Sequence, residues 1–123
     1  MKIIIPGRLP GLNEYIDAER TNRYRAAKMK REMEDLVILC AKSDLRGRKP
    51  KCPVMMHYLW VEKDRKRDKD NISGYGRKVV QDALVRAKIL PGDGWAQIVG
   101  FTDEFAVDKM HPRVEVEIEE VNR

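Results

Sequence analysis

The residues with the clearest chemical potential are two aspartates, Asp68 and Asp70, in the run VEKDRKRDKDN at positions 61–71. In an extended segment, side chains two positions apart point the same way, so both carboxylates would face one spot. Neighbouring cations relieve the repulsion between them, and both can remain ionised at neutral pH. Such a pair can hold Mg²⁺, which completes its shell with water and substrate phosphate.

The same run supplies cations suited to phosphate, Arg65, Lys66 and Arg67. Metal and phosphate ligands would then lie side by side, as metal-assisted phosphodiester hydrolysis requires. A lone Asp-x-Asp in a charged loop is also an ordinary solvated turn, so this chemistry needs a third carboxylate. Asp93 is the best candidate, although an aspartate in a Gly-Asp-Gly turn is equally a common turn former.

The charge of the chain is unevenly distributed. Residues 1–92 hold 22 Lys or Arg against 12 Asp or Glu, a net of +10, whereas residues 93–123 hold 3 against 8, a net of −5. A basic field of this size suggests a polyanionic partner, most simply nucleic acid. Basic surfaces also occur in proteins without such a partner, so charge leaves both interpretations open.

The elements that would position these residues have the order β-α-β-α-β-β. Hydrophobic periodicity predicts strands at 1–5, 54–63, 96–108 and 113–121, and helices at about 19–43 and 73–88. The segment RLPGLNEYI between the first strand and the first helix reads as a loop. We expect an α/β (α+β) domain over residues 1–123, with a mixed sheet of about four strands packed against two main helices.

Several patterns predict what is buried. The second strand is apolar on both alternations, which is typical of a central strand covered on both faces. In the last strand, Val114, Val116 and Ile118 alternate with glutamates, so one face should be buried and the other acidic. A single aromatic residue beside a strand is usually buried, so Trp95 is expected in the core, and stacking on a nucleic-acid base is its alternative role.

The chain shows no signal-peptide pattern and no apolar run long enough to cross a membrane, which predicts a cytoplasmic protein. Its two cysteines, Cys40 and Cys52, form no Cys-x-x-Cys pair, and only two histidines accompany them. Neither a disulfide framework nor a zinc site is therefore expected.

Three segments together resemble the RusA family of Holliday-junction resolvases, known from bacterial and prophage genomes. They are RDKDN, RKVVQDAL and ILPGDGWAQI, in that order along the chain. The N-terminal LPGLNEYI is also similar to the first loop of that family, and the predicted order of elements matches.

The resemblance implies a homodimeric, Mg²⁺-dependent endonuclease, with Mn²⁺ as a substitute, that resolves four-way DNA junctions in recombination and repair. Asp68, Asp70 and Asp93 would be the metal-binding catalytic residues, and Lys78 would stabilise developing charge. The expected DNA contacts are Asn13, Tyr15, Arg65, Lys66, Arg67 and Lys69. The sequence departs from the family pattern in two places: ISGYGR separates Asn71 from Lys78, and Gly92 stands where an acidic pair is often found.

Two supporting residues keep alternative interpretations. Lys78 and Asp82 are four apart on a helix, where they can form a surface ion pair instead of a functional one. Asn71 can cap the helix that follows it or orient Asp70, and capping is favoured. Two rival functions also remain: a non-catalytic DNA-binding accessory protein of recombination, and a metal-dependent nuclease for RNA or flap DNA.

Overall fold

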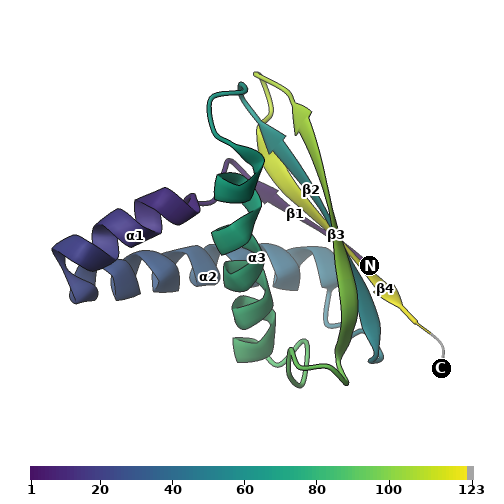
Figure 1. The fold of residues 1–123 in the computed structure, drawn as a ribbon. Coiled ribbons are helices and arrows are strands. Elements are labelled where there is room, and N and C mark those ends of the chain that lie inside the picture. The colour runs from purple at the N-terminus through teal and green to yellow at the C-terminus, as the bar shows by residue number, and fades with distance from the viewer. Residues whose placement is uncertain (122–123) are drawn as a thin grey trace.

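The computed structural model describes residues 1–121, so residues 122 and 123 of the domain expected over 1–123 lie outside the described part. Seven elements follow one another along the chain (Figure 1). They are β1 (Lys2–Pro6), α1 (Leu12–Thr21), α2 (Arg23–Leu45), β2 (Val54–Glu62), α3 (Lys69–Arg86), β3 (Ile98–Val107) and β4 (Arg113–Glu120). The predicted α+β class with a four-stranded mixed sheet is confirmed.

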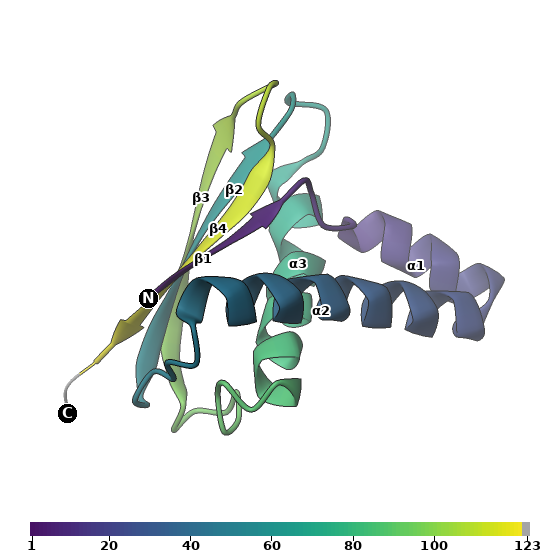
Figure 2. The same ribbon diagram turned by 180° about the vertical axis from the view of Figure 1, so that it is seen from behind.

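The strands form one sheet in the order β1-β4-β2-β3. β4 pairs antiparallel with both β1 and β2, whereas β2 and β3 are parallel and are connected through α3. All three helices lie on the same side of this sheet, as the two opposite views show (Figures 1 and 2). β3 is an edge strand, so among the described residues its outer edge pairs with no other strand.

The core lies between the sheet and the helices. Val114, Val116 and Ile118 of β4 are buried as the alternation predicts. The sequence also predicts a buried stripe on the last helix at Val79, Val80, Ala83, Leu84 and Ala87. The first four are buried in α3, whereas Ala87, the C-cap residue, is only half-buried. The hydrophobic pattern of these two elements is therefore sufficient to orient them.

Gly76 allows α3 to approach β2 closely. A Cβ atom at this position would lie 2.6 Å from the indole ring of Trp60, which is 1% exposed in the centre of the core. At Gly74, two residues earlier, a Cβ atom would make only an ordinary van der Waals contact, 3.8 Å from the Leu12 side chain. The sequence suggests a flexible helix entry for this pair, whereas the structure makes Gly76 a packing residue.

Among residues 1–121, no helix covers the other face of the sheet. This corrects the expectation that β2 is covered on both faces. This outer face carries Glu104, Glu115, Glu117 and Glu119, with His57 among them. The His57 ring bonds through Nδ1 to the Thr102 hydroxyl at 2.8 Å and through Nε2 to Glu119 at 2.9 Å. The outer face is therefore acidic and open.

The segment RLPGLNEYI, expected as a loop at residues 8–16, is a loop only up to Gly11, and α1 begins at Leu12. The chain bends at Asn22, whose backbone is extended and whose side chain accepts a hydrogen bond from the Tyr24 N–H at 2.9 Å. α1 has no fully buried residue, and it packs against α2 and α3 rather than against the sheet. The two helices project from the sheet side by side (Figures 1 and 2).

Among residues 1–121, no helix is both long and apolar enough to span a bilayer. The described structure contains Cys40 and Cys52 as free cysteines.

Candidate active site

The amino-terminal end of α3 borders an open pocket of about 780 Å³. One wall is the charged loop that leaves β2, and the opposite wall is the end of β3, from Phe105 to Val107. Loop and helix meet here because β2 ends at Glu62 and α3 begins only seven residues later. Both aspartates of RDKDN line this pocket.

Asp68 and Asp70 belong to the start of a helix rather than to an extended strand. Asp68 is the N-cap residue, with φ −67° and ψ 151°, and Asp70 lies in the first turn. The helix begins four residues earlier than predicted, so the two aspartates do not lie in the extended segment expected of them. Both still line the pocket. Neither carboxylate forms a hydrogen bond or ion pair among the described residues, and the helix dipole favours negative charge here.

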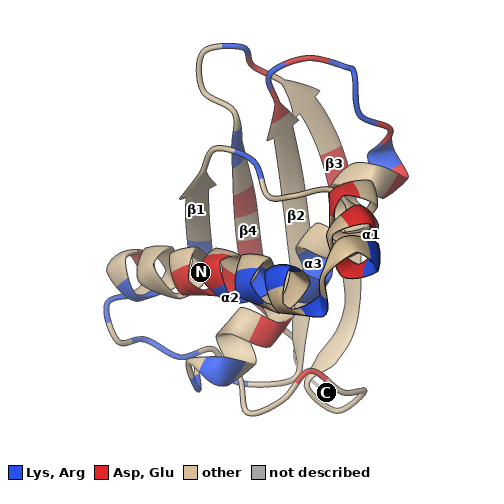
Figure 3. Cartoon of the chain, turned by 90° about the vertical axis from the view of Figure 1, so that its left-hand side faces the viewer, with Lys and Arg blue, Asp and Glu red and all other residues tan. Residues whose placement is uncertain are grey.

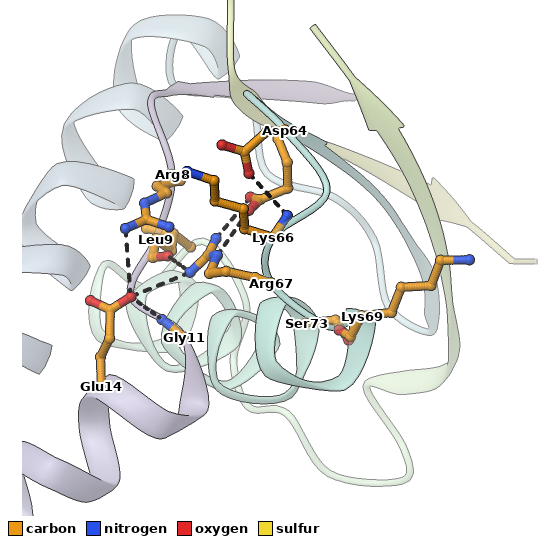
Figure 4. A network of polar contacts seen from close by, with 10 residues as sticks. Arg8, Leu9, Gly11, Glu14, Asp64, Lys66, Arg67, Lys69 and Ser73 are labelled. Carbon is orange, nitrogen blue, oxygen red and sulfur yellow. Dashed lines mark hydrogen bonds and ion pairs between the residues drawn. The ribbon is translucent and has the colours of Figure 1, made fainter. Parts of the chain in front are cut away.

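Arg67 holds the charged loop against the rest of the fold (Figure 4). Its Nε and Nη2 atoms each donate to the Glu62 carboxylate at 2.8 Å, and Nη1 donates to the Leu9 carbonyl at 3.1 Å. Its Nη1 also lies 3.6 Å from Glu14 of α1. These contacts use the guanidinium internally and give Arg67 a structural role, whereas its expected contact with DNA stays a prediction.

Asn71 connects α1 to the start of α3. Its Oδ1 accepts a hydrogen bond from the Asn13 N–H at 2.8 Å, so it satisfies a free donor in the first turn of α1. The expectation that Asn71 caps its own helix is therefore wrong. A Cβ on Gly11 would lie 2.7 Å from the Asn71 amide, so a glycine lets the two segments approach.

Tyr15 is a second link between α1 and α3, and the DNA contact expected of it stays a prediction. Its ring stacks on Tyr75 with centroids 4.4 Å apart, and Tyr15 is half-buried. Burial raises the pKa of Tyr75, whose hydroxyl has no hydrogen-bond partner among residues 1–121. Asn13 itself is exposed.

Three of the expected phosphate ligands remain on the surface beside the pocket. Arg65, Lys66 and Lys69 are exposed, and Arg65 and Lys69 line the pocket directly. The Lys69 ammonium lies 5.5 Å from the centre of the Phe105 ring, a cation–π contact across the pocket. Phosphate could therefore be bound by these cations without breaking the Arg67 contacts.

Asp93 lies away from the other two aspartates. It follows α3, whose 18 residues span about 27 Å, and it precedes the start of β3, whereas the pocket lies at the end of β3. Within one chain, the structure therefore separates Asp93 from Asp68 and Asp70. The expected three-carboxylate cluster is not formed, and residues 1–121 contain no group of three His, Cys, Asp or Glu side chains able to hold a metal ion.

Two carboxylates still fit Mg²⁺ in chemistry and number. This ion prefers oxygen ligands and is commonly held by one or two carboxylates, with the remaining positions filled by water and substrate phosphate. Asp68 and Asp70 offer oxygens that no described protein group occupies. They are the residues of this chain that would hold the ion.

Lys78 forms a surface ion pair with Asp82, which is the alternative to a functional role. Its ammonium lies 3.4 Å from Asp82, and its side chain is 66% exposed, two helical turns beyond Asp70. Asp82 is bound more closely by Lys30 of α2, at 2.6 Å. Burial raises the pKa of Asp82, but the hydrogen bond and charge of Lys30, together with Lys78, outweigh it and lower the pKa overall.

Sequence reasoning missed Glu62 and Phe105. Glu62 is buried at the end of β2, where the apolar strand pattern continues into the charged run, and its arginine partner five residues later was the available signal. Phe105 comes from a strand more than thirty residues away, and no local pattern links it to the aspartates.

The comparisons with known proteins add no relative. No protein-family model matches the chain, and no curated protein matches its sequence.

Proposed function

We propose that this protein is a Mg²⁺-dependent endodeoxyribonuclease that resolves four-way DNA junctions as a homodimer. The observation that carries the proposal is a pair of carboxylates, Asp68 and Asp70, to which no other described side chain is bound. They lie at the start of α3 in an open pocket lined by Arg65 and Lys69. The resemblance of RDKDN and the segments after it to the RusA family supports branched DNA as the substrate.

In this proposal, Asp68 and Asp70 hold the metal, and the exposed cations hold the phosphates on either side of the scissile bond. Bound Mg²⁺ would activate a water molecule and neutralise charge on the phosphodiester. Arg67 positions the loop through Glu62. Lys78 has no part in the chemistry, because its partner is Asp82.

A twofold dimer offers Asp93 a route to the pocket. Within residues 1–121 no strand pairs with the outer edge of β3, and antiparallel pairing of two such edges places the start of one strand beside the end of the other. Asp93 lies just before the start of β3, and Phe105 to Val107 line the pocket at its end. Asp93 of a second copy would then approach Asp68 and Asp70.

The test of the nuclease is a paired measurement on Asp70→Asn. Cleavage of a synthetic four-way junction in Mg²⁺ should fall by orders of magnitude, while binding in EDTA should persist or tighten, because repulsion between carboxylate and phosphate is relieved. Asp17→Asn, an exposed aspartate on α1, is the control for the change in net charge. If the wild type never cuts, or if Asp70→Asn cuts equally well, the nuclease proposal fails.

The contribution of Asp93 can be tested with mixed dimers. Asp70→Asn and Asp93→Asn should each be inactive alone. A mixed dimer contains one Asp70→Asn chain and one Asp93→Asn chain. If Asp93 acts across the interface, one of its two sites keeps all three aspartates, and the dimer should nick the junction once. If Asp93 acts within its own chain, neither site of the mixed dimer is complete and no cleavage is recovered.

One observation favours a second candidate, a non-catalytic DNA-binding accessory protein. The separation of Asp93 leaves two carboxylates where the family resemblance implies three. Tight junction binding with no Mg²⁺- or Mn²⁺-dependent cleavage would favour this candidate. Comparing junction, linear duplex, flap and RNA substrates tests the remaining rival, a metal-dependent nuclease for another structure.

A further inference from the structure

The tip where α1 meets α2, residues 20–31, is the most basic short segment of the helix layer. It contains six Lys or Arg and no Asp or Glu. Figure 3, which looks onto this tip, shows basic residues gathered where the two helices join. Lys30 turns inward to Asp82 and Glu34, but the remaining cations stay on the surface. Among the described residues, Arg20, Arg23, Arg25 and Arg31 have no acidic partner within 4.0 Å.

Tyr24 stands in the middle of these cations with its side chain in solvent. It is 88% exposed, whereas the other three tyrosines are half-buried or buried. The backbone N–H of Tyr24 donates a hydrogen bond to the side chain of Asn22, and this bond fixes the first turn of α2 below the tyrosine ring. Tyr24, Lys28 and Arg31 are spaced i, i+4 and i+7, so they share one outward face of α2.

The tip is within reach of DNA bound at the pocket. α1 starts beside Asn71, next to Asp70, and its ten residues extend about 15 Å to the tip. A nucleic-acid strand advances about 3.4 Å per nucleotide. A strand with a phosphate at the pocket would therefore reach the tip after about four or five nucleotides.

The composition of the tip favours nucleic acid over a lipid surface. A helix that lies in a membrane interface needs an apolar face beside its basic one. Within residues 20–31, the apolar side chains are Ala26, Ala27 and Met29, and Ala26 is buried while Met29 packs against the core. Cations flanking an exposed aromatic ring are the arrangement by which proteins hold single-stranded nucleic acid, with bases stacked on the ring.

We propose that the tip is a second DNA-binding element, in which the arginines bind phosphates and Tyr24 stacks on an exposed base face. The choice of DNA rests on the proposed function. A closed duplex offers no free base face, whereas a branch point or a single strand does. Tyr24 therefore gives the protein a preference for branched or single-stranded DNA, separate from the carboxylates that would cut it.

The experiment measures binding in EDTA to three probes: a single-stranded oligonucleotide, a four-way junction, and a relaxed circular duplex without ends or loops. Tyr24→Ala should weaken binding to the first two about tenfold and leave the circle unchanged. Tyr24→Phe should bind as the wild type does, because stacking needs the ring and not the hydroxyl. Arg23→Ala should weaken binding to all three and flatten the salt dependence by about one unit.

The matched control is Leu39→Ala, which removes another exposed side chain from α2 about 22 Å from Tyr24. It should leave all three affinities unchanged. Equal binding by Tyr24→Ala and wild type would overturn the inference, as would binding to anionic vesicles without binding to DNA. If Tyr24→Ala shows the expected loss but the wild type never cuts, the inference stands and the nuclease proposal fails. If the wild type cuts and Tyr24→Ala binds normally, only the inference fails.

Discussion

The guanidinium of Arg67 and the carboxylate of Glu62 form a two-point ion pair, with both N–O distances 2.8 Å and both side chains about nine-tenths buried. The pair joins the last residue of β2 to the residue before the α3 N-cap. It thereby closes the charged loop into a fixed shape and holds Asp68 and Asp70 on the pocket wall.

Removing this arginine should destabilise the fold strongly. Arg67→Ala leaves the Glu62 charge buried without a partner, which typically costs about 3 kcal/mol of the free energy of unfolding. Chemical denaturation is the measurement, and Lys66→Ala, an exposed neighbour, is the control, with a change within about 0.5 kcal/mol. Equal stability of the two variants would show that Arg67 is not a structural residue.

The two glycines of α3 should respond in opposite directions to the same substitution. Gly76→Ala places a methyl group 2.6 Å from the buried Trp60 ring and should destabilise the protein by about 1–3 kcal/mol. Gly74→Ala meets no close neighbour, only an ordinary contact with Leu12 at 3.8 Å, and should stabilise the helix by about 0.5–1 kcal/mol. Thermal unfolding of both variants tests this, and a stabilised Gly76→Ala would contradict the close approach of α3 to β2.

The stability contributed by Asp82 should depend on pH. Its pKa is lower in the fold than in the unfolded chain, because Lys30 and Lys78 outweigh the opposing effect of burial. The stabilisation is therefore present above the ordinary aspartate pKa of about 4 and is lost as the pH falls through the lower folded value. Unfolding free energies measured from pH 7 to pH 2 should show a difference between wild type and Asp82→Asn that shrinks with acidification. A difference that stays constant or grows would contradict the Lys30 pairing.

The cations beside the pocket should set part of the salt dependence of DNA binding. Arg65→Ala should flatten the plot of log affinity against log salt by about one unit, because one phosphate contact is lost. Lys2→Ala is the control, since Lys2 lies on the opposite face of the sheet and pairs with Glu115 at 3.1 Å. An unchanged slope for Arg65→Ala would remove this residue from the DNA surface.

Much of the fold follows from local patterns. The alternation of β4 and the spacing of Val79, Val80, Ala83 and Leu84 are predictable, because each element needs one buried face. α1 was missed because it buries no stripe of its own, and its stability comes from contacts with α3, such as the stacking of Tyr15 on Tyr75. Trp95 was expected in the core, but it is 96% exposed on the loop before β3.

The candidate site was predictable only in part. Asp68 and Asp70 could be grouped because only one residue separates them in the sequence. Asp93 could not be placed, because its distance from them depends on the length and direction of α3. Composition also cannot distinguish Arg67 from Arg65, since the burial of one and the exposure of the other depend on where Glu62 lies when β2 ends.

The open, acidic face of the sheet has a consequence for how the molecule meets a polyanion. Its glutamates lie on one side of the sheet, and the cations of the α1–α2 tip lie in the helix layer on the other side. This separation gives the whole protein a permanent electric dipole moment. Under the proposed function, the field of a nucleic acid would exert a torque on that dipole and turn the helix layer toward the polyanion before contact. Salt shortens the range of this pre-orientation to about 8 Å at physiological ionic strength.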